Sequence, residues 1–243
     1  HVGYSAHLDH LGLDPAEGAE AAESNTDLVN NGAYDNASGI AAMLEVAKAF
    51  AASPSAPRRS VLFLAVTGEE KGLQGAEYFA AHPTVAESSL VADFNLDMFL
   101  MLFPVRDVVA FGAEHSTLEA VVARAAERSG FTVSPDPYPE EVVFVRSDQY
   151  AFVKAGVPAV FLVAGFHSGD PATDGEKATR EWLVTKYHSP QDDLSQPMDL
   201  DSGVRFARAN FLAGLEVANT ATRPTWNPGD FFGQRFGRKE AKP

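Results

Sequence analysis

Imidazole and carboxylate side chains gather around the ends of apolar runs in this sequence. They are His7 and Asp9 after the run 2–6, Asp35 before the segment 38–52, Glu69 and Glu70 after the run 60–67, and Asp97 after the run 90–96. Taken singly, each is a common turn or capping residue. Carboxylates that are brought to one place repel each other unless cations lie between them. The set therefore indicates a cation site wherever the fold joins these positions.

The composition limits what such a site can be made of and what it can bind. The chain has no cysteine, so any metal must be held by histidine nitrogen and carboxylate oxygen. The formal charge of −14 argues against nucleic acid as a partner, because phosphate binding needs a basic face. No stretch of the sequence approaches the ~20 apolar residues that a membrane span needs.

Hydrophobic periodicity predicts the elements that position these residues. We expect strands at 2–6, 60–67, 90–98, 107–111 and 158–164, with helices at 38–52, 72–81, 116–129, 148–155 and 200–219. The continuous apolar run 60–67 is typical of a buried parallel strand. Alternating strands and helices predict an α/β fold with three α/β/α layers and a mostly parallel central sheet. Ligands bind such sheets at the carboxyl ends of the strands, where the acidic groups fall.

The connecting segments carry fewer signals. Residues 14–33 are expected to form a loop, and the polar segment 165–186 is expected to have no regular element. Ser116 and Glu119 have the spacing of a capping box, and Ser147 stands where it would cap the helix at 148–155.

Six segments match one protein family in order. They are 7–12 (HLDHLG), 32–39 (GAYDNASG), 67–75 (TGEEKGLQG), 95–98 (NLDM), 146–148 (RSD) and 187–193 (YHSPQDD). The chain resembles the co-catalytic zinc exopeptidases, which include bacterial leucyl aminopeptidases and glutamate carboxypeptidase-like peptidases. The resemblance implies a zinc-exopeptidase (phosphorylase/hydrolase-like) fold, a metal-dependent hydrolase and a peptide substrate. The segment 168–186 is longer than in compact aminopeptidases and could form part of a pocket rim or a lid.

The resemblance also implies a role for each matched residue. Two Zn²⁺ per chain would share Asp35; His7 and Asp97 would complete one site, and Glu70 and His188 the other. Two such ions can share one hydroxide and clamp a transition state.

Three further residues would act around the metals. Glu69 would be the general base on the bridging water. Asp9, two residues beyond His7, would hold the second ring nitrogen of that histidine. Tyr187 would donate a hydrogen bond to the tetrahedral oxyanion. In relatives the peptide bond after the bridging aspartate is cis, so we expect a cis or strained Asp35–Asn36 bond.

The resemblance and the length together suggest the domain organisation. At 243 residues, the chain suits one large domain. We expect a catalytic domain at 1–221, without the N-terminal part that relatives have, and a C-terminal arm at 222–243. Because the chain starts on a strand without an initiator Met, we interpret it as a processed or truncated piece. An accessory domain upstream and export to the periplasm or the exterior follow from the resemblance, and an oligomer stays open.

Four functions fit this family resemblance, and aminopeptidase is the one we favour. A carboxypeptidase or dipeptidase would need a cationic pocket, for which Arg146 is the one suggestive residue. A single-zinc glutaminyl cyclase shares the fold, but the intact Glu69–Glu70 pair resembles the peptidases. A binding ectodomain without catalysis has no reason to keep every ligand and the base.

Overall fold

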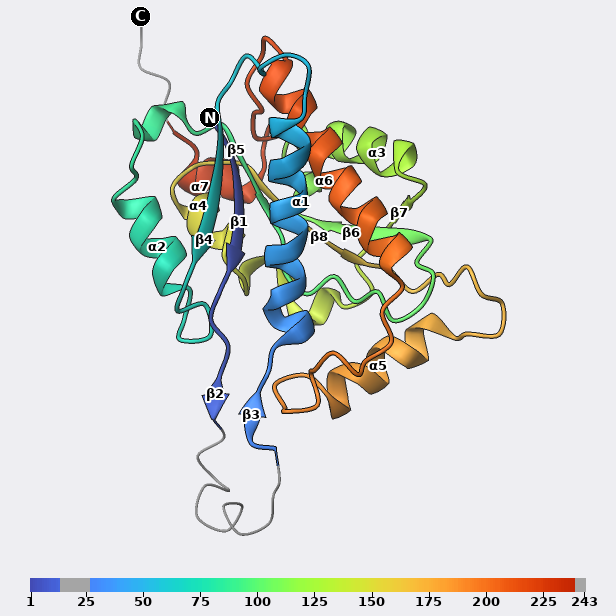
Figure 1. Ribbon diagram of the computed structural model, residues 1–243. Helices are drawn as coiled ribbons and strands as arrows, with labels where there is room; N and C mark the ends of the chain where they lie inside the picture. The colour runs from blue at the N-terminus through green and yellow to red at the C-terminus, as the bar shows by residue number, and fades with distance from the viewer. Residues whose placement is uncertain (14–26, 239–243) are drawn as a thin grey trace, which may run out of the picture.

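A six-stranded sheet in the order β4-β1-β5-β8-β6-β7 forms the centre of the protein (Figure 1). The structure is a computed structural model that describes residues 1–13 and 27–238. The strands are β1 (Val2–His7), β4 (Val61–Val66), β5 (Ala92–Asn95), β6 (Asp107–Phe111), β7 (Thr132–Ser134) and β8 (Ala159–Ala164). The first four strands in this order run parallel to one another, and β6 is antiparallel to β8. The prediction of a mostly parallel sheet is confirmed.

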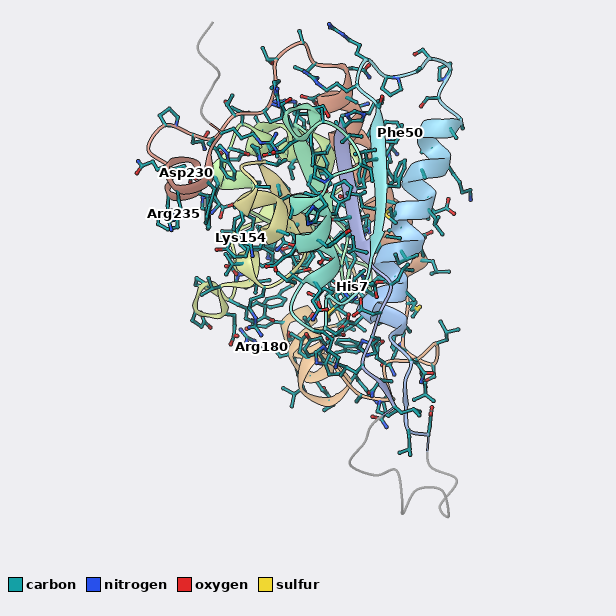
Figure 2. All side chains as sticks on the ribbon, turned by 90° about the vertical axis from the view of Figure 1, so that its left-hand side faces the viewer. His7, Phe50, Lys154, Arg180, Asp230 and Arg235 are labelled. Atoms are coloured by element: carbon teal, nitrogen blue, oxygen red, sulfur yellow. The ribbon has the colours of Figure 1, made fainter. Side chains whose placement is uncertain are left out.

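Helices cover both faces of the sheet, which gives the three expected layers. One face carries α1 (Gly39–Ala51), α3 (Leu118–Arg128) and α6 (Leu200–Asn219); the other carries α2 (Gln74–Ala81), α4 (Gln149–Lys154) and α7 (Phe231–Phe236). Figure 2 shows the layers from the side, with Phe50 of α1 and Lys154 of α4 on opposite sides of the sheet.

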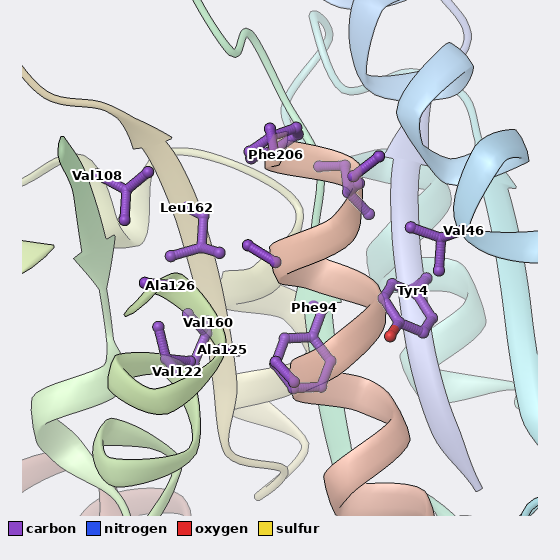
Figure 3. Packing of buried hydrophobic residues seen from close by; sticks show 14 of the residues in the cluster. Tyr4, Val46, Phe94, Val108, Val122, Ala125, Ala126, Val160, Leu162 and Phe206 are labelled. Carbon is purple, nitrogen blue, oxygen red and sulfur yellow. The ribbon is translucent and has the colours of Figure 1, made fainter. Parts of the chain in front are cut away.

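The core under α1 and α6 fixes the strand that leads to the acidic cluster. Tyr4 of β1 is fully buried and stacks on Phe94 with ring centroids 5.5 Å apart (Figure 3). Its hydroxyl donates a 2.8 Å hydrogen bond to the backbone oxygen of Asn210 in α6. A Cβ at Gly214 would lie 1.7 Å from that hydroxyl oxygen, so the close approach of α6 to β1 requires glycine. This packing holds β1, and with it His7, against the helical layer.

The described part of the C-terminal arm packs on the opposite face. Phe232 of α7 meets Phe144 edge-to-face, with ring centroids 5.2 Å apart. Asp230 accepts a 2.7 Å hydrogen bond from Nδ1 of His115. The arm therefore contacts the body of its own chain through both apolar and polar groups.

The expected burial of the run 60–67 is wrong. This run forms β4, which lies at the edge of the sheet, and Phe63 is 36% exposed. A continuous apolar run indicates that both faces of a strand meet apolar groups, but it does not indicate whether the hydrogen-bonding edge is covered.

The expectation that the segment 165–186 has no regular element is also wrong, because the segment contains helix α5 (Gly175–Thr185). Asp174 caps this helix by accepting a 3.0 Å hydrogen bond from the backbone N–H of Lys177. Among the apolar side chains of α5, Trp182 is buried, while Val184 is 85% exposed. The sequence therefore shows no apolar stripe long enough to reveal the helix.

The predicted capping box does not form. The backbone N–H of Ser116, which Glu119 should bind, donates instead to the backbone oxygen of Ala113 at 3.2 Å. Helix α3 accordingly begins at Leu118.

The expected loop at 14–33 is described only at its far end, because residues 14–26 lie outside the described part. Its flanks pair as a short ribbon of β2 (Gly12–Leu13) and β3 (Val29–Asn30). Figure 1 shows this ribbon and α5 at the same end of the sheet, beyond the carboxyl ends of β1, β4, β5 and β8. Within 1–13 and 27–238, no helix has the length and apolarity to cross a membrane.

Candidate metal centre

Five predicted ligands meet at the carboxyl ends of the parallel strands, where Figure 2 labels His7. They are His7 at the end of β1, Asp35 before α1, Glu70 after β4, Asp97 after β5 and His188 after α5. Nε2 of His7 lies 3.2 Å from Oδ1 of Asp35 and 3.4 Å from Oδ1 of Asp97. Nε2 of His188 lies 3.2 Å from Oδ2 of Asp35 and 3.3 Å from Oε2 of Glu70. Asp35 thus faces one imidazole with each of its two oxygens.

This donor set fits zinc. Histidine nitrogen and carboxylate oxygen are zinc ligands, and a catalytic site keeps a coordination position open. Oδ1 of Asp97 is a buried oxygen without a hydrogen-bond partner in the described structure, as expected for a metal-ligand oxygen. Ligand atoms of His7, Asp35 and Asp97 all lie within 4.8 Å of one another.

The pKa values of the two histidines also indicate a cation site. Burial works to lower the pKa of His7, but the carboxylates of Asp35 and Asp97 that face its Nε2 outweigh burial and raise the pKa to about 12. The carboxylates of Asp35 and Glu70 raise the pKa of His188 to about 9. Without a metal, protons on the imidazoles therefore compensate the carboxylates. Zinc binds neutral imidazole, so its binding would displace these protons.

Two neighbours hold the backbone of Asp35. The carboxylate of Asp192 accepts hydrogen bonds from the backbone N–H groups of Tyr34 at 2.8 Å and Asp35 at 2.9 Å. The side chain of Asn36 donates to the backbone oxygen of Leu96 at 3.0 Å, and the Asp35–Asn36 peptide bond is cis, as expected. Asp192 lies in the matched segment 187–193, but the resemblance gives it no role. Its role becomes visible only from its tertiary contacts with Tyr34 and Asp35.

Asp97 is held by a buried polar network. Ser147 donates a 2.7 Å hydrogen bond to Oδ2 of Asp97, and Ser147 in turn accepts one of 2.9 Å from Asn95. The one hydroxyl proton of Ser5 in β1 is shared between the side-chain oxygens of Asn95 and Asp93, each 2.9 Å from the hydroxyl oxygen. The prediction that Ser147 caps α4 is wrong, since its hydroxyl orients Asp97 instead.

Asp9 differs from its expected role. Nδ1 of His7 lies 2.9 Å from the backbone oxygen of Asp9 and 3.8 Å from its carboxylate. A carbonyl oxygen can only accept, so Nδ1 carries a proton, and Nε2 is the nitrogen that would bind a metal once its own proton is displaced. The carboxylate of Asp9 accepts the backbone N–H groups of Glu69 at 3.2 Å and Glu70 at 3.4 Å. Asp9 therefore fixes the turn after β4, and its main chain fixes the tautomer of His7.

His10 belongs to the cluster although it is not one of the predicted ligands. Its Nδ1 lies 2.8 Å from Oε1 of Glu70 and 3.8 Å from Oδ2 of Asp35. Its side chain is 9% exposed. The sequence feature that could have indicated this role is its place in the matched segment 7–12, three residues after His7.

Glu69 and Tyr187 flank the five ligands. Burial, followed by the negative charge of Asp97, raises the pKa of Glu69 to about 8, although the positive charge of His7 opposes this. A carboxyl group with a pKa near neutrality can take up and release a proton. The ring of Tyr187 stacks on His188 with centroids 3.7 Å apart, and Tyr187 is 38% exposed. Burial, and then the charge of Asp35, raises the pKa of Tyr187, so its hydroxyl stays a donor.

A mostly parallel α/β sheet with histidines and carboxylates at its carboxyl edge defines an α/β protein with a candidate metal centre at the usual ligand-binding edge of the sheet. The chain belongs to peptidase family M28, whose family model matches residues 1–213. It is 29% identical over 219 residues to a "Probable zinc metalloprotease" of Pyrenophora tritici-repentis, covering 80% of this chain and 50% of that protein. It is 28% identical over 170 residues to "Aminopeptidase YwaD" of Bacillus subtilis, covering 67% of this chain and 33% of that protein. The chain thus spans half or less of these relatives.

Solved structures share the fold at lower identity. The LapA aminopeptidase of Legionella pneumophila matches with a TM-score of 0.63 at 19% identity, over 91% of this chain and 52% of that one. A glutaminyl cyclase of Bacteroides thetaiotaomicron matches with a TM-score of 0.58 at 17% identity, over 91% of this chain and 73% of that one. The predicted resemblance to the zinc exopeptidases is confirmed at the level of the family and of the fold.

Proposed function

We propose that this chain is the catalytic domain of a di-zinc aminopeptidase that removes N-terminal residues from peptides. The observation that supports it most is Asp35, whose two oxygens each face a different histidine at 3.2 Å. His7 and Asp97 would hold one zinc ion, and Glu70 and His188 the other, with Asp35 shared. Two zinc ions held in this way would supply Lewis acidity and lower the pKa of a water between them.

The side chains of this chain would move the proton and orient the peptide. Glu69 would take a proton from the attacking water as the new carbon–oxygen bond forms. It would then give that proton to the amine nitrogen as the carbon–nitrogen bond breaks. The hydroxyl of Tyr187 would donate a hydrogen bond to the carbonyl oxygen as negative charge develops there.

The geometry favours aminopeptidase over carboxypeptidase. Arg146, the basic residue that suggested a carboxylate pocket, is 61% exposed and pairs with Glu141 at 3.0 Å. Among the described residues its charge is therefore engaged by Glu141 rather than by the metal centre. A glutaminyl cyclase stays the second candidate, because one of the structural neighbours has that name.

A substrate panel with zinc-loaded protein tests the proposal. We expect release of the chromophore from aminoacyl-4-nitroanilides with a free amine and no release from their N-acetylated counterparts. Loss of ammonia from peptides with N-terminal glutamine would favour the cyclase instead. Sequential loss of C-terminal residues from blocked peptides would favour a carboxypeptidase.

The domain boundary between residues 221 and 222, an accessory domain upstream and export of the protein stay predictions.

A further inference from the structure

We infer that His10 is a positioning residue that holds Glu70 so that only Oε2 of this carboxylate is presented to a metal ion. The inference rests on the proposed di-zinc function and adds a residue that the matched ligand set does not include. It concerns one of the two metal positions, the one next to His188.

The contacts of Glu70 divide its two oxygens between two histidines. Oε1 lies 2.8 Å from Nδ1 of His10, a normal hydrogen-bond length. Oε2 lies 3.3 Å from Nε2 of His188 and so points to the place where the ligands converge. Since an ionised carboxylate only accepts, Nδ1 of His10 carries the proton and donates it to Oε1. One oxygen of Glu70 is thereby occupied, and the other is left for the ion.

The surroundings of His10 keep its ring in this place. The side chain is 9% exposed, and its ring meets that of His188 edge-to-face with centroids 5.7 Å apart. On another side a Cβ at Gly32 would lie 3.0 Å from Cγ of His10, so the glycine leaves room for the ring. Nε2 of His10 is buried and has no hydrogen-bond partner in the described structure. The single polar contact of the ring at normal hydrogen-bond length is therefore the one to Glu70.

A carboxylate that binds through one oxygen takes one coordination position, and one that binds through both takes two. By engaging Oε1, His10 leaves a further position at this metal for water or for the substrate amine. Such hydrogen bonds to a ligand also fix its orientation, and losing them typically weakens metal binding 10–100-fold.

Two substitutions separate the hydrogen bond from the packing of the ring. His10→Phe keeps an aromatic ring against His188 but has no donor. His10→Asn loses the ring but places an amide N–H near the position of Nδ1. His82→Phe, at an exposed histidine away from the cluster, is the matched control.

The experiment is calorimetric titration of the metal-free full chain with Zn²⁺, in two backgrounds that each weaken one site. In the Asp97→Asn background, His10→Phe should reduce the remaining zinc affinity roughly 10–100-fold, while His10→Asn stays within about threefold of its parent. In the Glu70→Gln background, His10→Phe should change the remaining affinity less than about twofold, because His10 acts through Glu70. Circular dichroism of each metal-free variant checks the fold.

The outcomes distinguish this inference from the proposed function. Two zinc ions in the wild-type chain, with unchanged affinity in His10→Phe, would overturn the inference alone. An equal loss in both backgrounds would also overturn it, since His10 would then act on the fold or on Asp35. A wild-type chain that binds no zinc would overturn both the inference and the proposed function.

Discussion

Ser147 donates a 2.7 Å hydrogen bond to Oδ2 of Asp97, while Oδ1 of the same carboxylate faces His7 at 3.4 Å. This contact joins the turn before α4 to the end of β5. It orients a predicted metal ligand, although the position of Ser147 in the sequence predicts a helix cap. The contact therefore ties the packing of α4 to the geometry of the centre.

Ser147→Ala should weaken zinc binding at the site of His7 and Asp97 by roughly 10-fold or more, because Asp97 loses its orienting donor. Zinc titration of the metal-free chain measures this. Ser195→Ala, which removes a similar 2.6 Å hydrogen bond from an exposed serine to Asp193, is the control and should leave zinc affinity unchanged. Equal zinc affinities in the two variants would show that Ser147 does not orient Asp97 for metal binding.

Glu69→Gln should keep both zinc ions and lose about 10²–10⁴-fold in turnover, because the amide cannot accept the proton of the water. Metal content and initial rates on a free-amine anilide substrate are measured together. Glu114→Gln, at a side chain that is 60% exposed, should keep full activity. A fully active Glu69→Gln protein would show that another group is the base.

Removal of the metal should destabilise the protein, because protonated histidines then take the place of the cations between the carboxylates of Asp35, Glu70 and Asp97. Ligands that bind only the folded state stabilise it, by about 4 kcal/mol at a thousandfold excess over Kd. Thermal unfolding with a chelator and with added zinc measures the difference. A melting temperature that zinc does not raise would count against a preformed site.

Asp93 should make the stability fall as the pH rises. Burial raises its pKa from 3.8 to about 7 in the folded chain, although Ser5 donates a hydrogen bond to it. The folded state therefore retains a proton that the unfolded state releases above pH 4. The resulting loss of stability amounts to about 1.4 kcal/mol for each pH unit between roughly 4 and 7.

Asp93→Asn should remove the part of this slope that Asp93 contributes, so the variant should gain stability relative to the wild type between pH 5 and pH 8. Burial also raises the pKa of Glu69 to about 8 and that of Asp148 to about 7, so a shallower slope of the same sign should remain. Urea unfolding at the two pH values gives the free energies. Glu181→Gln, at an exposed side chain of α5, should keep the wild-type slope. A parallel slope in Asp93→Asn would mean that Asp93 is already ionised in the folded chain.

Much of the centre could be predicted because its residues follow directly on apolar strands. The strands ending at His7, Glu70 and Asp97 are visible as apolar runs, and parallel strands bring their carboxyl ends to one edge. Helix α6 was predicted with the bounds that the structure has.

What could not be predicted depends on pairing across the fold. Asp192, Ser147 and His10 each contact a predicted ligand or its backbone, but the partners lie between 50 and 157 residues apart in sequence. No local pattern encodes such a contact. The role of Asp9 was misjudged because strand alternation suggests the direction of a side chain but not whether its main-chain oxygen lies closer to His7.

Anomalous diffraction at the zinc edge, from a crystal of the zinc-loaded chain, tests whether two zinc ions share Asp35. Two anomalous peaks are expected on either side of the Asp35 carboxylate, one between His7 and Asp97 and the other between Glu70 and His188. A single peak, or peaks away from Asp35, would contradict this arrangement.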